Sequence, residues 1–154
     1  MPTIKESDKD DIETLSELWY SLASSMEQYS ELNKLKDTAK EDSSEGFSKL
    51  FEDEDTTIFL LETGKEAIGF MVLQEGEQPS RKHENYVSIV DLFVKEGYRS
   101  QGYGSEMIEK AEEYAEQQDC GYLKVSSEWE NREARKFYQR NDFEEKKVEY
   151  TKKI

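Results

Sequence analysis

Apolar side chains recur at three- and four-residue intervals between positions 12 and 22, and this spacing predicts an amphipathic helix with one buried stripe. A short strand is expected before that helix, at residues 3–5. A weaker helical pattern covers residues 43–51. Two strand-like runs follow, at residues 57–62 and 67–73, and the short sequence between them contains Gly64, so the runs predict a β-hairpin.

The run at residues 86–94 is the most nearly continuous apolar segment of the chain, so we expect it to be a strand covered on both faces at the centre of a sheet. Further periodic segments follow it: a helix at 105–118, a strand at 120–127, a helix at 131–140, and one broken or two short strands at 143–154 that close the sheet. Strands and helices therefore alternate through the second half of the chain, which is typical of an α/β fold.

The chain has 154 residues, a length that fits a single domain covering residues 1–154. Its 21 basic and 36 acidic side chains give a formal net charge of −15. This charge repels phosphate backbones and argues against general nucleic-acid binding, whereas it favours cationic partners. Solubility or tolerance of high ionic strength explains the same charge without any partner.

No apolar run approaches the roughly 18 to 20 residues that a membrane-spanning helix needs, and the first residues lack the apolar core of a secretory signal. We therefore expect a cytoplasmic protein without a membrane partner. The single cysteine, Cys120, cannot form an intramolecular disulfide, and with the single histidine, His83, it makes no zinc framework. No metal is expected.

The segment Arg99-Ser100-Gln101-Gly102-Tyr103-Gly104 joins the apolar strand at 86–94 to the helix at 105–118. Backbone amides at a helix N-terminus attract anions, and glycines let a ligand approach closely, so a phosphate-bearing cofactor fits here. The lysine of an ATPase P-loop and the third glycine of a dehydrogenase loop are missing. A plain strand-to-helix turn would also explain the two glycines.

This segment resembles the acetyl-CoA loop of GNAT superfamily N-acetyltransferases, which reads Arg or Gln, two residues, Gly, one residue, then Gly or Ala. Residues 131–138 and Phe143 resemble the family's second motif, Asn-x-x-Ala-x-x-Phe-Tyr followed by Gly-Phe. Asp142 stands where glycine is usual, and we expect it to alter the turn after the helix. The resemblance spans residues 86–143 and implies a GNAT-like fold, with a mixed, splayed central sheet flanked by helices.

The resemblance also implies where acetyl-CoA binds as the cosubstrate. The pantetheine arm is expected on the backbone of the apolar strand, and the pyrophosphate on the amides that follow it. Asn131 either caps the last helix or also bonds the cofactor. The cofactor-binding residues implied in this way are Leu92, Phe93, Val94, Arg99, Ser100, Gln101, Gly102, Tyr103, Gly104, Ser105 and Asn131.

Two residues are candidates for proton transfer. By its position in the motif, Tyr138 stands where a phenol can protonate the departing thiolate, and packing beside Phe137 is the alternative explanation. Asp91 is the candidate base, because burial in a strand raises the pKa of a carboxyl group. A structural carboxylate holding a strand bulge is its alternative explanation, and Glu128 and Glu130 are the other candidate bases.

The central strand resembles the diamine acetyltransferase branch most, although Val90 stands where that branch carries a glutamate. We expect direct transfer of acetyl to a primary amine of a small cationic acceptor such as a polyamine or aminoglycoside. A protein N-terminal or lysine acetyltransferase acting on a peptide amine is an alternative. A non-catalytic CoA-binding module, which Val90 favours, is another. The family resemblance is compatible with a homodimer.

Overall fold

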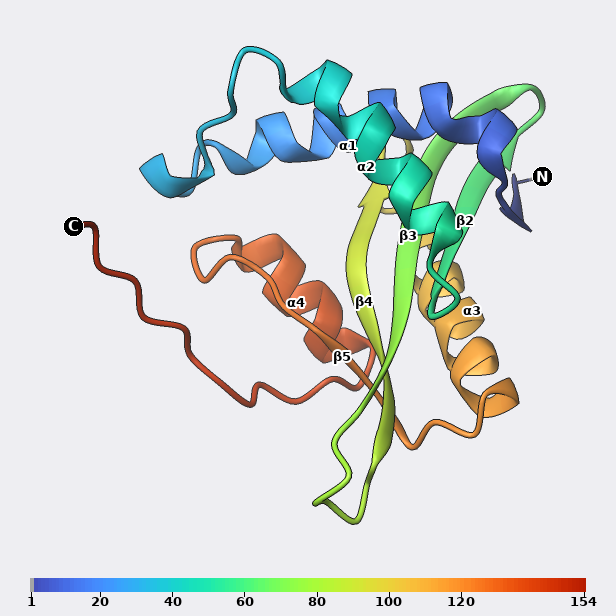
Figure 1. Cartoon of the computed structure of the whole chain (residues 1–154), viewed down its shortest axis with the longest axis vertical. Helices are drawn as coiled ribbons and strands as arrows, with labels where there is room; N and C mark the ends of the chain where they lie inside the picture. The colour runs from blue at the N-terminus through green and yellow to red at the C-terminus, as the bar shows by residue number, and fades with distance from the viewer. Residues whose placement is uncertain (1) are drawn as a thin grey trace.

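The computed structural model describes residues 2–154 and has an open five-stranded sheet with helices against both faces (Figure 1). The strand order follows the sequence, and every neighbouring pair is antiparallel except β4 and β5, which are parallel. The mixed α/β sheet predicted from the sequence is thereby confirmed. Its strands are β1 (Pro2–Glu6), β2 (Thr56–Thr63), β3 (Glu66–Glu77), β4 (Asn85–Val94) and β5 (Tyr122–Val125).

Side chains alternate between two hydrophobic clusters along the inner strands. In β2, Ile58 and Leu60 face the cluster formed with α1 and α2, while Phe59 and Leu61 face the cluster formed with α3. This period of two is what a strand buried on both faces requires. The helices are α1 (Ile12–Met26), α2 (Ala39–Glu52), α3 (Tyr103–Gln117) and α4 (Arg132–Arg140).

A β-bulge at Val90 reverses the two faces of β4. Asp91 pairs with Val72, but the next pair joins Ile89 to Leu73, so Val90 has no partner in the ladder. Because one extra residue moves every later side chain to the opposite face, Ile89 packs with the α3 cluster and Phe93 packs with the α1–α2 cluster. The strand is covered on both faces, as predicted.

The predicted strands at residues 143–154 are absent, and this prediction is wrong. Residues 144–154 are exposed and run clear of the sheet from the end of α4 (Figure 1). Their composition is the reason, since seven of the eleven residues are Lys or Glu and little apolar surface is available to offset the entropy of ordering them. Without these strands β4 is fourth of five, so its predicted central position is also wrong.

The turn after α4 has the backbone conformation that is usual for glycine, so the expectation that Asp142 alters this turn is wrong. Asp142 adopts a left-handed conformation with φ of 67°, and the Phe143 amide donates to the Tyr138 carbonyl oxygen at 3.0 Å. Aspartate is among the few residues that tolerate this conformation, because its short polar side chain bonds locally. The helix end is therefore retained despite the missing glycine.

Within residues 2–154, no helix combines the length and the apolar character that crossing a bilayer requires.

Candidate active site

The strands β4 and β5 part from each other halfway along β4. They pair only from Tyr86 to Ile89 in β4 and from Tyr122 to Val125 in β5. Beyond that point, the second half of β4 pairs with β3 on one edge and with no strand on the other. The Val90 bulge lies where the pairing ends, and a bulge bends and twists its strand. We call the resulting opening the splay.

The loop after β4 presents a row of amides without protein acceptors. A 3-10 turn (η3, Glu96–Tyr98) leads into it, and Ser100 and Gly102 have positive φ values of 62° and 87°. Gly102 is the N-cap of α3, and no side chain caps this helix end. Among the described residues, no acceptor lies against the amides from Ser100 to Ser105. An uncapped N-terminus of this kind attracts an anion through its amides and the helix dipole.

Gly104 has a packing role that the sequence did not indicate. A Cβ atom there would lie 2.9 Å from two ring carbons of Phe137. Because Gly104 has no side chain, the Phe137 ring can pack on the first turn of α3, which brings residues 99–104 and residues 131–138 together. The small residue is needed here for helix packing, whatever ligand approaches the loop.

Arg99 folds back over the end of β4. Its Nε donates to the Val94 carbonyl oxygen at 2.7 Å, and its guanidinium lies 5.6 Å from the centre of the Phe93 ring. In residues 2–154, no partner is found for its two terminal nitrogens. The side chain is thus fixed at the mouth of the loop with two donors that remain available to an anion.

Tyr138 packs edge-on between two aromatic rings, with centroid distances of 5.2 Å to Phe137 and 5.5 Å to Phe143. No hydrogen-bond partner for its hydroxyl is found among the described residues. Among these residues, no side-chain nitrogen or oxygen atom is fully buried without a partner. The hydroxyl therefore retains access to the outside. Burial, reinforced by the negative charge of Asp91, raises the pKa of Tyr138 to about 12.

Asp91 is partly buried, and within residues 2–154 its carboxyl group makes no hydrogen bond or ion pair. Burial raises the pKa of its carboxyl group to about 6, since no donor or cation stabilises the charge. The carboxylate therefore does not hold the bulge through a hydrogen bond. The negative charge of Asp91 also contributes to the raised pKa of Tyr138.

Asn131 is the N-cap of α4, where its Oδ1 accepts from the Ala134 amide at 3.1 Å. Capping therefore accounts for the oxygen of this side chain. Its amide nitrogen has no partner among the described residues and is available to a ligand. Nearby, the guanidinium of Arg135 stacks 3.7 Å from the centre of the Trp129 ring and donates to the Trp129 carbonyl oxygen.

Sequence reasoning missed Asn33, which connects two distant loops. It lies in a short 3-10 turn (η2, Glu31–Asn33) between α1 and α2. Its Nδ2 donates to Oε1 of Glu128, in the connection between β5 and α4, and also to the Met26 carbonyl oxygen. No local pattern marks a hydrogen bond between residues so far apart in sequence. The contact brings the α1–α2 connection against the loop that carries Glu128.

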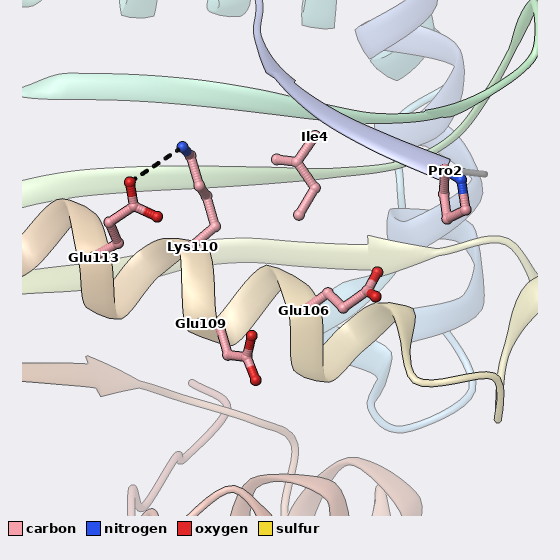
Figure 2. A pocket seen from close by; sticks show the side chains of 6 residues that line it. All are labelled: Pro2, Ile4, Glu106, Glu109, Lys110 and Glu113. Atoms are coloured by element: carbon pink, nitrogen blue, oxygen red, sulfur yellow. Dashed lines mark ion pairs between the residues drawn. The ribbon is translucent and has the colours of Figure 1, made fainter.

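Two surface hollows lie outside the amide row. One is at the start of α4 and is lined by Trp129, Glu130, Arg132 and Arg135. The other lies between β1 and α3, where Glu106, Glu109 and Glu113 come from one helix and Lys110 pairs with Glu113 at 3.8 Å (Figure 2). Because β1 and β5 are opposite edges of the sheet, the second hollow is separate from the splay. No cluster of metal-ligating side chains is found in residues 2–154.

Comparison with known proteins gives consistent matches. The model of the acetyltransferase (GNAT) family matches residues 16–143. An uncharacterised N-acetyltransferase of Methanocaldococcus jannaschii is 27% identical over 146 residues, and the match covers 95% of this chain and 62% of that protein. An uncharacterised N-acetyltransferase of Archaeoglobus fulgidus is 28% identical over 142 residues, with 90% of each protein covered.

A solved structure of an aminoglycoside N-acetyltransferase in complex with CoA superposes with a TM-score of 0.79 at 17% identity, covering 99% of this chain and 95% of the other. At this identity the likeness concerns the fold. The chain spans about three-fifths of the length of the Methanocaldococcus relative.

Proposed function

Because the chain belongs to the acetyltransferase (GNAT) family, we propose that it transfers the acetyl group of acetyl-CoA to a primary amine of a small cationic acceptor, by direct attack within one ternary complex. The observation that carries this proposal is the adjacency of two unpaired backbone segments. The free edge of β4 leads directly into the uncapped amides at the start of α3. An elongated ligand with an anionic part fits such a path.

The free edge of β4, from Leu92 to Val94, offers backbone groups to the amide-bearing pantetheine arm. The amides from Ser100 to Ser105 and the terminal nitrogens of Arg99 offer donors to the pyrophosphate. These contacts act at short range, whereas charges farther than about 8 Å are largely screened at physiological salt. A chain of net charge −15 can therefore still bind a polyanion.

Tyr138 is the proposed acid. Its raised pKa keeps the phenol protonated at neutral pH, so it can donate a hydrogen bond to the sulfur as the carbon–sulfur bond breaks. The thiolate of CoA has a lower proton affinity than this phenol, since an ordinary thiol has a pKa of about 8.5. Stabilising the sulfur by donation is therefore the main contribution expected from Tyr138, and the sulfur leaves with a proton from this group or from water.

Asp91 is the proposed base. Attack requires a neutral amine, and a carboxylate with a pKa of about 6 is mostly ionised at pH 7 while still able to accept a proton. The amine nitrogen forms the new bond to the acetyl carbon and releases one proton, which passes to Asp91 directly or through a water molecule. Glu128 and Glu130 are the other candidates, and the hydrogen bond from Asn33 fixes the orientation of Glu128.

Negative charge supports a cationic acceptor. Glu128 and Glu130 lie in the connection after β5, and the hydrogen bond of Asn33 brings the α1–α2 connection, with Glu27, close to Glu128. A cation is drawn toward such a rim by long-range attraction. The likeness in fold to an aminoglycoside N-acetyltransferase makes aminoglycosides and polyamines the first acceptors to test.

A thiol-release assay with a panel of amines tests the proposal. Polyamines, aminoglycosides and lysine-bearing peptides are offered with acetyl-CoA to the wild type and to Tyr138→Phe. We expect turnover with a polyamine or an aminoglycoside, and we expect Tyr138→Phe to lower kcat about 10²-fold while CoA affinity stays nearly unchanged.

Each of the other outcomes of this assay indicates a different function. Turnover on peptides alone indicates a protein acetyltransferase. A thermal shift with acetyl-CoA but no turnover on any amine indicates a CoA-binding module. The absence of any thermal shift with acetyl-CoA overturns the cofactor assignment itself.

A further inference from the structure

The side chain of Asn33 joins two connections that lie far apart in the sequence. Among the described residues, its hydrogen bond to Glu128 is the only one between residues 27–38, which follow α1, and residues 126–131, which follow β5. The same amide nitrogen also donates to the Met26 carbonyl oxygen at 3.0 Å, so both of its hydrogens have acceptors. Asn33 is thereby tied to the end of α1 and holds the Glu128 carboxylate in one orientation.

The connection that carries Asn33 is itself held in place by local hydrogen bonds. Oε2 of Glu27 accepts from the Leu35 amide at 2.9 Å, which closes a loop of eight residues. Within that loop, the Ser30 hydroxyl accepts from the Leu32 amide at 3.1 Å. A group held by such supporting bonds keeps the geometry of the group that it contacts. Asn33 therefore reaches Glu128 from an ordered loop.

Asp91 faces the same side of the sheet as α1 and α2. It pairs with Val72, and paired residues of neighbouring strands point to one face. Val72 belongs to the cluster beneath α1 and α2, and so does Phe93, two residues after Asp91. The amide row begins α3, which covers the other face. The proposed base and the loop that holds Glu128 are therefore on one face, opposite the proposed pyrophosphate site.

The register of the parallel pair places Asp91 and Glu128 on the two sides of the splay. Pairing of β4 with β5 ends at Ile89 and Val125. Asp91 lies two residues beyond Ile89, and Glu128 lies three residues beyond Val125 (Figure 1). Because the strands run parallel, both residues are displaced in the same direction, and their backbones are farther apart than the roughly 4.8 Å between paired strands. A ligand that contacts both carboxylates must carry two separated cationic groups.

The charge of Glu128 is not neutralised within the protein. Among the described residues no lysine or arginine pairs with it, and only its Oε1 accepts a hydrogen bond. A fixed carboxylate with a free oxygen binds an ammonium group through a charge-assisted hydrogen bond. Val90, next to Asp91, is 51% exposed and belongs to neither hydrophobic cluster. Its side chain offers apolar contact to a spacer between two amino groups.

We propose that Asn33 is a positioning residue that holds Glu128 where this carboxylate binds a second ammonium group of the acceptor, while the reacting amine lies beside Asp91. This inference rests on the proposed function and narrows the acceptor to a diamine with an apolar spacer. The acetyl group and the proton released by the reacting amine move as in the proposed reaction. The second ammonium group keeps its proton throughout and is unchanged in the product.

Two amines with the same spacer test the role of Glu128. The measured quantity is the selectivity ratio, kcat/KM for 1,4-diaminobutane divided by kcat/KM for n-butylamine, which lacks the second ammonium group. We expect a ratio of about 10 to 100 for the wild type, as for a hydrogen bond to a charged group. Glu128→Gln keeps the oxygen that accepts from Asn33 but loses the charge, so the ratio should fall toward one. A base role for Glu128 would instead lower both rates and leave the ratio unchanged, which overturns the proposal.

The same ratio tests Asn33. Asn33→Ala should lower the ratio in the wild-type background and have little further effect in the Glu128→Gln background, because a residue that acts through another is not additive with it. The matched control is Gln28→Ala, which removes an exposed amide of the same connection that donates to the Ser25 carbonyl oxygen at 2.8 Å. This control should keep the wild-type ratio. Lower thermal stability of Asn33→Ala at an unchanged ratio limits Asn33 to supporting the loop and overturns the proposal.

Binding separates this inference from the proposed function. The two amines are titrated calorimetrically into the full chain saturated with CoA, so the result does not depend on turnover. We expect the diamine to bind about tenfold or more tightly than the monoamine, and we expect Glu128→Gln to remove that difference. Equal affinities of the two amines for the wild type overturn the inference. Tighter binding of the diamine without acetylation of any amine supports the inference and overturns the proposed function alone.

Discussion

The negative charge of Asp91 contributes, after burial, to the raised pKa of the Tyr138 hydroxyl. Both groups lack hydrogen-bond partners among residues 2–154. Polar groups without partners in a partly buried place destabilise the fold, so replacing one of them should change the stability of the protein.

Replacing Asp91 by asparagine should stabilise the protein at alkaline pH. The folded-state pKa of Asp91 is about 6, above its ordinary value of 3.8, so the folded protein holds this proton more tightly than the unfolded chain does. Stability therefore falls as the pH rises from about 4 to about 6. We expect Asp91→Asn to raise the free energy of unfolding by up to about 3 kcal/mol at pH 8, with little gain near pH 4. Urea denaturation at the two pH values measures this, and an equal gain at both contradicts it.

The same carboxyl group should shape the pH dependence of the reaction. If Asp91 is the base, kcat/KM rises with pH through about 6 as the group ionises. Asp91→Asn should remove that limb and lower the rate at pH 7.5 by about 10²-fold or more. Glu116→Gln serves as the matched control, because Glu116 is an exposed carboxylate near the end of α3, outside the proposed site. If kcat/KM of Asp91→Asn still rises with pH near 6, another group is responsible for that rise.

Much of the fold follows from local pattern. Ile12–Met26 and Tyr103–Gln117 show helical spacing, and residues 57–73 show the hairpin, because each element buries a face that its own sequence marks. The prediction of strands at residues 143–154 was wrong because a local pattern does not show whether a pairing partner exists. The alternation in this segment is real, but pairing requires a neighbour, and the periodicity of a segment does not say whether a neighbour is supplied by its own chain.

Candidate site residues close in sequence were easier to place than contacts between distant segments. Asn131 lies at a helix start that the sequence indicates and has the capping position expected, and Gly102 lies at the start of the helix predicted after it. The Asn33–Glu128 hydrogen bond and the contact of Gly104 with Phe137 depend on how separate elements pack. Neither contact has a signature at one position, since both partners must be known together.

Replacing Asp142 by glycine should stabilise the end of α4. Asp142 has a φ of 67°, which glycine adopts without the penalty that a Cβ atom incurs. We expect Asp142→Gly to raise the free energy of unfolding by about 0.5 to 1 kcal/mol and Asp142→Ala to lower it by a similar amount. Thermal unfolding of the wild type, Asp142→Gly and Asp142→Ala measures these differences in stability. A glycine variant less stable than the alanine variant would mean that the carboxylate itself supports the turn.

Two substitutions at Asn131 separate capping from cofactor binding. Asn131→Ala removes the Oδ1 acceptor and should cost about 1 kcal/mol of stability. Asn131→Asp keeps the acceptor but replaces the free amide nitrogen with negative charge, so it should retain stability and bind acetyl-CoA more weakly. Calorimetric titration alongside thermal unfolding provides the comparison. Unchanged affinity in Asn131→Asp limits this residue to capping.

Gly104→Ala should show that the position of the loop at residues 99–104 depends on its packing against α4. The added Cβ would lie 2.9 Å from the Phe137 ring, so either the ring or the first turn of α3 must move. We expect a loss of about 1 to 3 kcal/mol in stability and weaker binding of acetyl-CoA, because the amides at the start of α3 shift with the helix. Gly97→Ala is the matched control, since an added Cβ there meets nothing within 4 Å. Adding Phe137→Leu to Gly104→Ala should recover part of both losses, as expected for residues in contact. If the double variant loses as much stability as the two single variants together, the two residues act independently, and the predicted coupling between the loop and α4 is contradicted.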